Sequence, residues 1–437
     1  QQLTDNINLV ARENLTGLRV VRAYNVEDYQ EAKFTKANKD LTETQLFTNR
    51  VMAFMMPLMN TVLNGLMLAV YWIGAYLIDA AGLKDKLTVF SNMVVFSNYS
   101  VQVIMSFLLM SMVFVLWPRA DVSAQRIMEV LDTEPIVENG TKTAADVAKT
   151  GQRGTVEFRN VSFAYPDSRE AMLEGINFTA EQGQTVAFIG STGSGKSSLI
   201  NLVPRFYDTS QGQVLVDGVD VRDYDLKALR DKIGYVPQQS VLFKGTVASN
   251  VSYGDRPGES ADVEMADTST PAGRKREAAL IAAGKAAEGA DMPAEQLNRI
   301  KAAADVAQAS EFVERMGGGY SAAIAQGGSN VSGGQKQRLS IARAVYRHPE
   351  ILIFDDSFSA LDFKTDREVR DALAREAKDS TKLIVAQRIG TIMNADRIVV
   401  LDDGKVVGQG THKELLDNCD VYRQIAESQL SQSELTA

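Results

Sequence analysis

Two long apolar stretches, residues 51–78 and 87–118, dominate the hydrophobic and polar pattern of the chain, and neither contains a charged residue. Each stretch is long enough to cross a bilayer core of about 30 Å as a helix. The short segment 79–86 between them is more polar, so the pattern predicts a membrane hairpin with spans at about 51–81 and 87–118. The residues ahead of it, 1–50, are polar and have a helical pattern.

Basic residues lie at both far ends of this hairpin. By the positive-inside tendency, both ends are then predicted to be cytoplasmic. Lys84 and Lys86 in the turn work against this assignment. The basic residues at the far ends are Lys33, Lys36, Lys39, Arg50, Arg119 and Arg126.

Polar side chains recur along one stripe of the second predicted span, and two asparagines are stacked on the first. They are Ser91, Asn98, Gln102 and Ser106 on the second span, and Asn60 and Asn64 on the first. Polar groups in a membrane helix must face protein or water. Two explanations remain open: hydrogen bonds between helices, or the lining of a substrate cavity.

Turn-forming and polar residues over 132–153 predict a linker. A soluble domain is predicted over 154–430, followed by a tail at 431–437. Short apolar runs at 156–158, 161–165 and 176–178 predict its first strands.

The sequence TVAFIGSTGSGKSS at 185–198 contains the pattern of a phosphate-binding loop between a buried strand and a helix. Glycines let consecutive backbone N–H groups face the phosphates of a nucleotide. Lys196 is predicted to reach the β- and γ-phosphates of ATP, and Ser197 to hold Mg²⁺. The residues predicted to bind the nucleotide here are Gly190, Ser191, Thr192, Gly193, Ser194, Gly195, Lys196, Ser197 and Ser198.

Two further features fit a nucleotide site. The apolar run 351–354 ends in Asp355 and Asp356, and acids at the carboxyl end of a buried parallel strand are typical of an Mg²⁺ site. Tyr165 precedes the phosphate loop and could stack on a purine or pack in the core.

Composition narrows the class of protein. The chain has 437 residues, enough for two or three domains. Its net charge of −9 argues against a nucleic-acid-binding surface, which needs clustered Lys and Arg. The single cysteine, Cys419, excludes an intrachain disulfide. Because residue 1 lies in a continuing helical pattern, we expect the true N-terminus to lie outside this sequence.

The run Asn-Val-Ser-Gly-Gly-Gln-Lys-Gln-Arg at 330–338 resembles the signature of ABC transporters, with Val331 where the family has Leu. In the same order as in the family, Tyr165 resembles the adenine-stacking residue, Gln238 the Q-loop glutamine and 359–362 the D-loop. The resemblance implies an α/β nucleotide-binding domain with an antiparallel β subdomain and a helical signature subdomain. It also implies Mg²⁺ ligands at Ser197, Gln238 and Asp355, and a catalytic contribution from Asp362. Four residues are implied to complete the ATP site of a partner chain: Ser332, Gly333, Gly334 and Gln335.

The apolar spans ahead of the nucleotide domain resemble those of exporters, and they imply all-α transmembrane helices. Residues 16–34 resemble an intracellular loop with a coupling helix at about 23–28. A family half-transporter has six spans, so the two here form a partial membrane domain. The implied location is the cell membrane, with the nucleotide domain in the cytoplasm. The implied partners are a second half-transporter, the lipid bilayer and an unidentified transported substrate.

Three departures from the family pattern change the expected chemistry. Asp356 stands where the family has its catalytic glutamate, and Gln387 where it has the switch histidine. An insertion at about 255–300 exceeds the family pattern by about 35 residues and is expected to have no catalytic role.

Aspartate is one methylene shorter than glutamate, and a misplacement of about 1 Å can slow a reaction about a hundredfold. Glutamine cannot carry the positive charge of an imidazole. We therefore expect slow hydrolysis at the chain's own site and a competent site, completed by its signature, on a different partner. A slow homodimer and a membrane-anchored regulatory ATP-binding subunit remain open. The spans argue against a soluble ABC ATPase that acts on nucleic acid.

Overall fold

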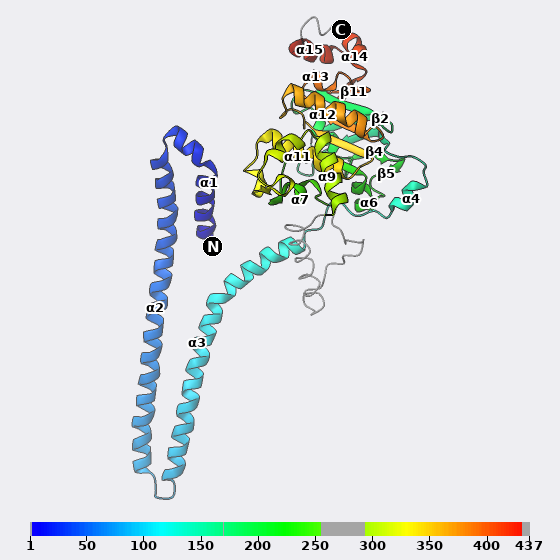
Figure 1. The fold of residues 1–437 in the computed structure, drawn as a ribbon. Helices are drawn as coiled ribbons and strands as arrows, with labels where there is room; N and C mark the ends of the chain where they lie inside the picture. Colours follow the sequence, from blue (N-terminus) through cyan, green and yellow to red (C-terminus); the bar gives the residue numbers. More distant parts are fainter. Residues whose placement is uncertain (1, 169, 255–292, 431–437) are drawn as a thin grey trace. The chain divides into compact units, whose positions relative to one another are not determined.

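The computed structural model describes residues 2–168, 170–254 and 293–430. The chain divides into two compact units, residues 1–134 and 135–437 (Figure 1). The apolar stretches fall in the first unit and the phosphate loop in the second.

The first unit consists of three helices: α1 (Gln2–Tyr24), α2 (Glu27–Ala80) and α3 (Lys86–Leu131). Both long helices are apolar and long enough to cross a membrane. With 54 residues, α2 rises about 80 Å, far more than a bilayer core of about 30 Å. Its polar first half therefore continues outside the membrane, as the pattern of residues 1–50 predicts.

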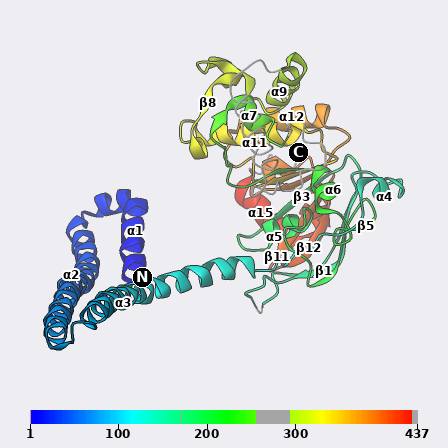
Figure 2. The ribbon, with the colours of Figure 1, turned by 90° about the horizontal axis from the view of Figure 1, so that it is seen from below.

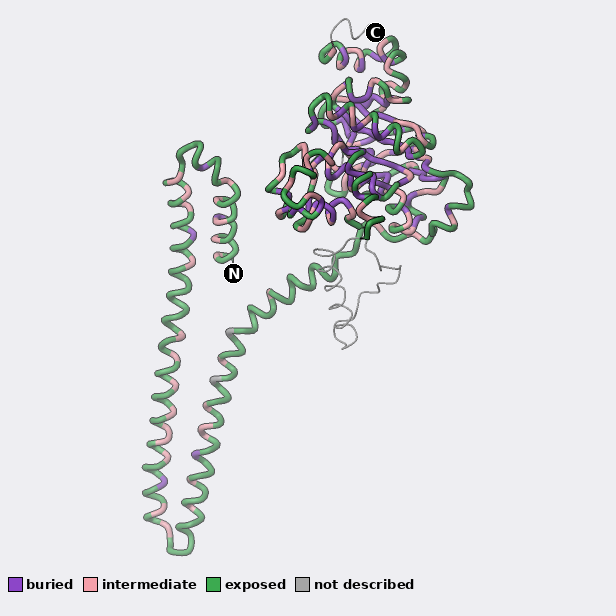
Figure 3. The backbone as a smooth tube through the Cα atoms, in the orientation of Figure 1, coloured by how far each residue is buried: buried purple, intermediate pink, exposed green. Residues whose placement is uncertain are grey.

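The two long helices are in close contact at a glycine. A Cβ atom at Gly74 of α2 would lie 2.2 Å from the sulfur of Met93 in α3. Elsewhere the two long helices are largely exposed, as Figure 3 shows by its green tube. Apolar side chains that face outward along a helix pair of this length fit contact with lipid.

The coupling helix implied at about 23–28 is not a separate element. Tyr24 ends α1, Glu27 begins α2, and the chain turns between them. Asn25 adopts a φ of 53°, a conformation that asparagine tolerates better than most residues. Residues 23–28 therefore do not form one continuous helix, because a left-handed residue separates α1 from α2 there, and the coupling role of this segment stays a prediction.

The polar stripe of the second span lies on the exposed surface of α3. Among the described residues, no hydrogen bond joins these side chains to α2, and the Ser106 hydroxyl donates to the Gln102 carbonyl within its own helix at 2.9 Å. Gln102 and Ser106 line a shallow groove with Tyr99 and Phe107. The interpretation as bonds within this hairpin is not confirmed.

The second unit is built on a six-stranded sheet with the strand order β12-β11-β3-β10-β9-β6. All neighbours are parallel except β11 and β12 at one edge. The strands are β3 (Thr185–Gly190), β6 (Ile233–Val236), β9 (Ile351–Asp355), β10 (Thr381–Val385), β11 (Arg397–Asp402) and β12 (Lys405–Gly410). Every residue of β9 is buried, as expected for a central strand that is covered on both faces.

A second sheet is antiparallel, with the order β2-β1-β4-β5. Its strands are β1 (Val156–Phe163), β2 (Leu173–Ala180), β4 (Gln211–Val216) and β5 (Val219–Asp220). Phe158 and Phe178 stack between β1 and β2, with ring centroids 4.5 Å apart. The predicted antiparallel β subdomain is confirmed. A further short pair joins β7 (Gly245–Thr246) and β8 (Ala323–Ile324).

Helices surround the parallel sheet, and a helical group that includes α7, α9 and α11 lies to one side of it (Figure 2). The remaining elements are α4 (Ala144–Ala148), α5 (Lys196–Asn201), α6 (Leu226–Asp231), α7 (Val247–Val251), α9 (Ala294–Val306), α10 (Ser310–Arg315), α11 (Gly333–Tyr346), α12 (Phe363–Glu376), α13 (Ile389–Ile392), α14 (His412–Asn418), α15 (Asp420–Gln429) and short 3₁₀ turns at Gly319–Ser321 and Gln326–Gly328. The predicted helical signature subdomain corresponds to this group.

Part of the segment predicted as a linker packs onto the second unit. The backbone N–H of Thr141 donates to the Asp223 carbonyl at 2.9 Å, and Val147 of α4 is fully buried. These contacts attach residues 139–148 to the antiparallel sheet region. The insertion predicted at about 255–300 lies largely outside the described residues, which resume at residue 293.

Candidate nucleotide-binding site

Several of the predicted site residues lie where four neighbouring parallel strands end. In the sheet, β3, β10, β9 and β6 follow one another. Their carboxyl ends lead to the phosphate loop, to Gln387, to Asp355 and Asp356, and to Gln238, respectively. Residues separated by up to about 200 positions therefore meet at one sheet edge, which is where open α/β sheets bind their ligands.

Glycine is required at both ends of the phosphate loop. At Gly190 φ is 156°, and a Cβ atom would lie 1.9 Å from the Leu401 carbonyl oxygen. At Gly195 φ is 90°, and a Cβ atom would lie 2.6 Å from the Leu173 side chain. By contrast, a Cβ atom at Gly193 would meet nothing within 4 Å, so the middle of the loop borders open space. This backbone forms a cradle that a phosphate can enter.

Lys196 is folded against the loop that it belongs to. Its ammonium group donates to the carbonyls of Gly190 and Ser191, at 2.9 and 2.6 Å, and to the Ser194 hydroxyl at 3.2 Å. Burial lowers the pKa of Lys196, while the nearby carboxylates of Asp355 and Asp356 oppose this shift. A buried ammonium with only neutral acceptors is a strong partner for phosphate oxygens.

The hydroxyl of Ser197 donates to Oδ1 of Asp355 at 2.8 Å. Burial raises the pKa of Asp355, and the Ser197 hydrogen bond partly opposes this. Mg²⁺ is usually held in proteins by one or two oxygen ligands together with the phosphates of a nucleotide and water. A hydroxyl and a carboxylate in contact beside the loop fit that ion, so the predicted metal ligands Ser197 and Asp355 are brought together.

Asp356 is held by two glutamine amides. Gln387 donates from Nε2 to Oδ2 of Asp356 at 2.8 Å, and Gln238 donates to the same oxygen at 3.4 Å. Burial is the main cause of the raised pKa of Asp356. The backbone of Asp356 has a φ of 46°, an unfavourable conformation for a residue with a side chain. The two residues that depart from the family pattern thus touch one another.

Tyr165 follows β1 and reaches the start of α5. Its hydroxyl hydrogen-bonds with the Ser198 hydroxyl at 2.8 Å. The half-buried ring makes edge contacts with Phe163 and Tyr207, at 4.8 and 5.2 Å between centroids. Tyr165 therefore lies beside the phosphate loop, and its adenine-stacking role stays a prediction.

The signature lies at the start of α11, apart from the phosphate loop residues. Ser332 caps this helix: its hydroxyl accepts from the Gln335 N–H at 3.3 Å, while the Gln335 side chain accepts from the Ser332 N–H at 2.9 Å. Ser332 and Gly333 are exposed, and a Cβ atom at Gly334 would lie 3.4 Å from the Ala360 carbonyl. An exposed signature beside the D-loop is available to a ligand on another chain.

Asp362 occupies a helix cap. Its carboxylate accepts from the backbone N–H of Thr365 at 3.0 Å and from the Thr365 hydroxyl at 2.8 Å. These bonds lower the pKa of Asp362. The structure thus accounts for Asp362 as the N-cap of α12, and its predicted catalytic contribution is not tested.

No sequence pattern predicted the contacts around the switch residue Gln387. Arg388 donates to the carbonyls of Ser359 and Leu361, at 3.1 and 3.3 Å, and so joins the switch to the D-loop. Gln429 of α15 binds the backbone on both sides of Arg388. The pattern Ala-Gln-Arg at 386–388 could have drawn attention to Arg388, but no local signal marks Gln429.

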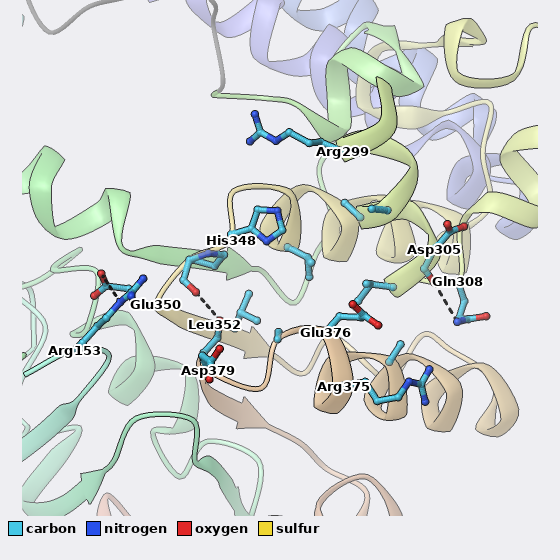
Figure 4. A pocket seen from close by; sticks show the side chains of 18 residues that line it. Arg153, Arg299, Asp305, Gln308, His348, Glu350, Leu352, Arg375, Glu376 and Asp379 are labelled. Atoms are coloured by element: carbon cyan, nitrogen blue, oxygen red, sulfur yellow. Dashed lines mark hydrogen bonds and ion pairs between the residues drawn. The ribbon is translucent and has the colours of Figure 1, made fainter. Parts of the chain in front are cut away.

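A cleft of about 620 Å³ lies at the opposite end of the sheet, among charged side chains (Figure 4). Glu350 and Ser380, which line it, directly precede β9 and β10. The phosphate loop and both aspartates follow the carboxyl ends of their strands. The cleft is therefore separate from the nucleotide site.

Comparison with known families agrees with this geometry. Residues 173–359 match the ABC transporter family model, and residues 1–114 match the model of the ABC transporter transmembrane region. The chain belongs to the ABC transporter family. Both the nucleotide site and the helical first unit are therefore parts of one known architecture, as the sequence resemblance implied.

Individual relatives cover nearly the whole of this ABC transporter chain. An uncharacterized ABC transporter ATP-binding protein of Mycobacterium tuberculosis is 39% identical over 98% of the chain. An ATP-dependent lipid A-core flippase of Aromatoleum aromaticum is 36% identical over 94% of the chain. The chain spans 66% of the length of the first relative and 60% of that of the second.

The fold is similar to that of a solved structure of a bacterial Atm1-family ABC exporter with ATP bound. The TM-score is 0.77, at 27% identity, and the similarity covers 99% of this chain and 69% of that chain. The exporter-type fold class predicted from the sequence is confirmed.

Proposed function

We propose that this chain is the ATP-binding and membrane-spanning part of an ABC exporter subunit that couples ATP binding and hydrolysis to transport. The observation that carries the proposal is the arrangement at the sheet edge, where Lys196, Ser197 and Asp355 meet beside the phosphate loop. Two helices long enough to cross a membrane belong to the same chain. Similarity to an exporter with ATP bound supports both halves of the proposal.

ATP would be held by the phosphate loop, with Lys196 facing its β- and γ-phosphates. Mg²⁺, held by Ser197 and Asp355 with help from Gln238, would neutralise phosphate charge when bound. The residues of this chain would orient the nucleotide by replacing hydrogen bonds within the protein with hydrogen bonds to the phosphates. On binding, Lys196 would donate to phosphate oxygens in place of the loop carbonyls, and the Ser197 hydroxyl would bind the metal in place of Asp355.

Hydrolysis at this chain's own site is proposed to be slow. Asp356 is the candidate to orient the attacking water, and two glutamine amides hold its carboxylate. Gln387 donates neutral hydrogen bonds and cannot supply the charge of an imidazolium. Because the side chain of Asp356 is one methylene shorter than that of a glutamate, it reaches less far toward the attacking water even when both amides hold it in place.

The signature is proposed to complete a second ATP site on a partner half-transporter. Its exposure supports this role, since Ser332 and Gly333 face solvent beside the D-loop. The start of α11 supplies backbone N–H groups that suit phosphate oxygens. Because the signature is intact apart from Val331, the partner's site is expected to be the faster one.

The same geometry at Asp356 also suits a membrane-anchored regulatory subunit that binds ATP without turning it over. The two functions differ in their dependence on a partner. Measuring ATP hydrolysis and transport with and without the partner half-transporter separates them, since a regulatory subunit adds no turnover of its own.

Nucleotide binding is tested by photolabelling the protein in membranes with a photoreactive ATP analogue. Lys196→Ala is expected to abolish labelling of this chain, because it removes the positive charge from the phosphate loop. Lys227→Ala is the matched control, since that lysine forms only an exposed ion pair with Asp231. Full labelling of the Lys196→Ala protein would disprove the assignment.

A further inference from the structure

Gln429, the last residue of α15, forms two hydrogen bonds with the backbone of residues 387–389, here called the switch segment. Nε2 of Gln429 donates to the Gln387 carbonyl at 2.8 Å, and Oε1 of Gln429 accepts from the Ile389 N–H at 2.9 Å. One side-chain amide thus binds the chain on both sides of Arg388. The two contacts require a donor and an acceptor, so they fix the orientation of the amide.

One of these two hydrogen bonds takes the place of a missing helix cap. Ile389 is the first residue of the four-residue helix α13, and Arg388 ahead of it makes no side-chain cap. Ile389 is fully buried, so its N–H would otherwise be unpaired in the interior. Gln429 supplies the acceptor from an element 40 positions away in the sequence.

Two side chains of the switch segment form hydrogen bonds within the nucleotide site. The Gln387 side chain reaches Asp356 at 2.8 Å, and the Arg388 side chain reaches the D-loop carbonyls. Both side chains start from the backbone that Gln429 holds. The helix that bears Gln429 is itself anchored, since Tyr422 and Ala426 are fully buried.

We infer that Gln429 is a positioning residue for the reaction at this site, through which α15 sets the place of the Gln387 amide against Asp356. The inference rests on the proposed hydrolytic function. Gln429 does not touch the nucleotide; it acts through the backbone of residues 387–389. The affinity for ATP therefore does not depend on it, whereas the rate of hydrolysis does.

The test is single-turnover hydrolysis of radiolabelled ATP by the protein in membranes. The phase that disappears with Lys196→Ala reports this chain's own site. Gln429→Ala is expected to slow that phase about fivefold or more, since small misplacements of catalytic groups have large effects on rate. The dissociation constant for ATP is expected to stay within about twofold, because the phosphate loop is unchanged.

Two further variants separate positioning from loss of structure. Gln429→Glu keeps the acceptor for Ile389 but replaces the donor to the Gln387 carbonyl with a second acceptor, so it is expected to be as slow as Gln429→Ala with an unchanged affinity for ATP. Ser428→Ala, one residue earlier in α15, removes only a local hydrogen bond to Ile425 and is expected to hydrolyse ATP normally.

A double-mutant cycle with Gln387→Ala decides whether Gln429 acts through Gln387. In that background Gln429→Ala is expected to cause no further slowing. An equal slowing in both backgrounds, or a wild-type rate for Gln429→Ala alone, overturns the inference while leaving the proposed function in place. If the wild type has no Lys196-dependent phase, the proposed hydrolysis fails and the inference fails with it.

Discussion

Asp356 and Ser332 belong to one chain but are proposed to act on two different ATP molecules. Substituting each should therefore change the ATPase activity of the assembly to a different extent. Asp356→Asn keeps the shape of the side chain and an oxygen that can accept from Gln387 and Gln238. Because that site is proposed to be slow already, the ATPase activity of the assembly should fall less than about twofold. Ser332→Ala should instead remove most of the activity.

The expected size of the Ser332 effect follows from what its hydroxyl does. In other enzymes, loss of one donor to a developing oxyanion slows the reaction about 100- to 1,000-fold. Ser332 also caps α11, however, and loss of an N-cap costs about 0.5–2 kcal/mol of stability. The two effects must therefore be measured separately.

Two variants at the same position make that separation. Aspartate is as good an N-cap as serine, so Ser332→Asp should keep α11 folded while its charge repels phosphate and abolishes turnover. Ser332→Thr keeps both the hydroxyl and the cap and should retain most activity. The assay is steady-state ATP hydrolysis with the wild-type partner. An inactive Asp356→Asn together with an active Ser332→Ala would refute the division of labour.

Two further predictions follow from single contacts. Tyr165→Ala should weaken ATP binding by about 1–3 kcal/mol if the ring stacks on adenine, whereas Tyr165→Phe, which loses only the bond to Ser198, should bind nearly normally; an unchanged dissociation constant for Tyr165→Ala would return the ring to a packing role. Burial lowers the pKa of His412 from 6.5, with the charge of Lys413 adding to the shift, so the folded state disfavours the protonated ring. The stability of the α14–α15 region, where His412 contacts Tyr422 at 2.6 Å, should be complete above pH 6.5 and decline below it. The measurement is hydrogen-exchange protection relative to the intrinsic rate at each pH, and His412→Ala should remove the decline.

Local patterns were sufficient for most of the candidate site, because its main parts are short and contiguous. The phosphate loop lies between its own strand and helix, and Asp355 ends a buried strand that Asp356 directly follows. Strand order, which no local pattern contains, brings these pieces together. One left-handed asparagine places a turn within residues 23–28, where the resemblance to the family implied a helix.

Long-range contacts explain what the sequence could not supply. Val147 lies in a polar stretch typical of a linker, yet it is buried because the antiparallel sheet region lies beside it. Gln429 is an ordinary polar residue near the end of an amphipathic helix, and only the fold places its amide at the backbone of residues 387–389. The sequence around Val147 and around Gln429 resembles that around many other residues of the chain, so no local pattern predicts their contacts.

The two departures from the family pattern form one structural feature rather than two independent losses. Gln387 donates directly to Asp356, so a change at either residue alters the partner of the other. The geometry of that pair depends in turn on the backbone that Gln429 holds. In Asp356→Glu, the longer carboxylate would meet the Gln387 amide, which is placed for the shorter aspartate. In Gln387→His, the imidazole would meet the carboxylate of Asp356, which lies too far back for it. We therefore expect the chemistry of this site to depend on the connected set Asp356, Gln387 and Gln429 rather than on Asp356 alone.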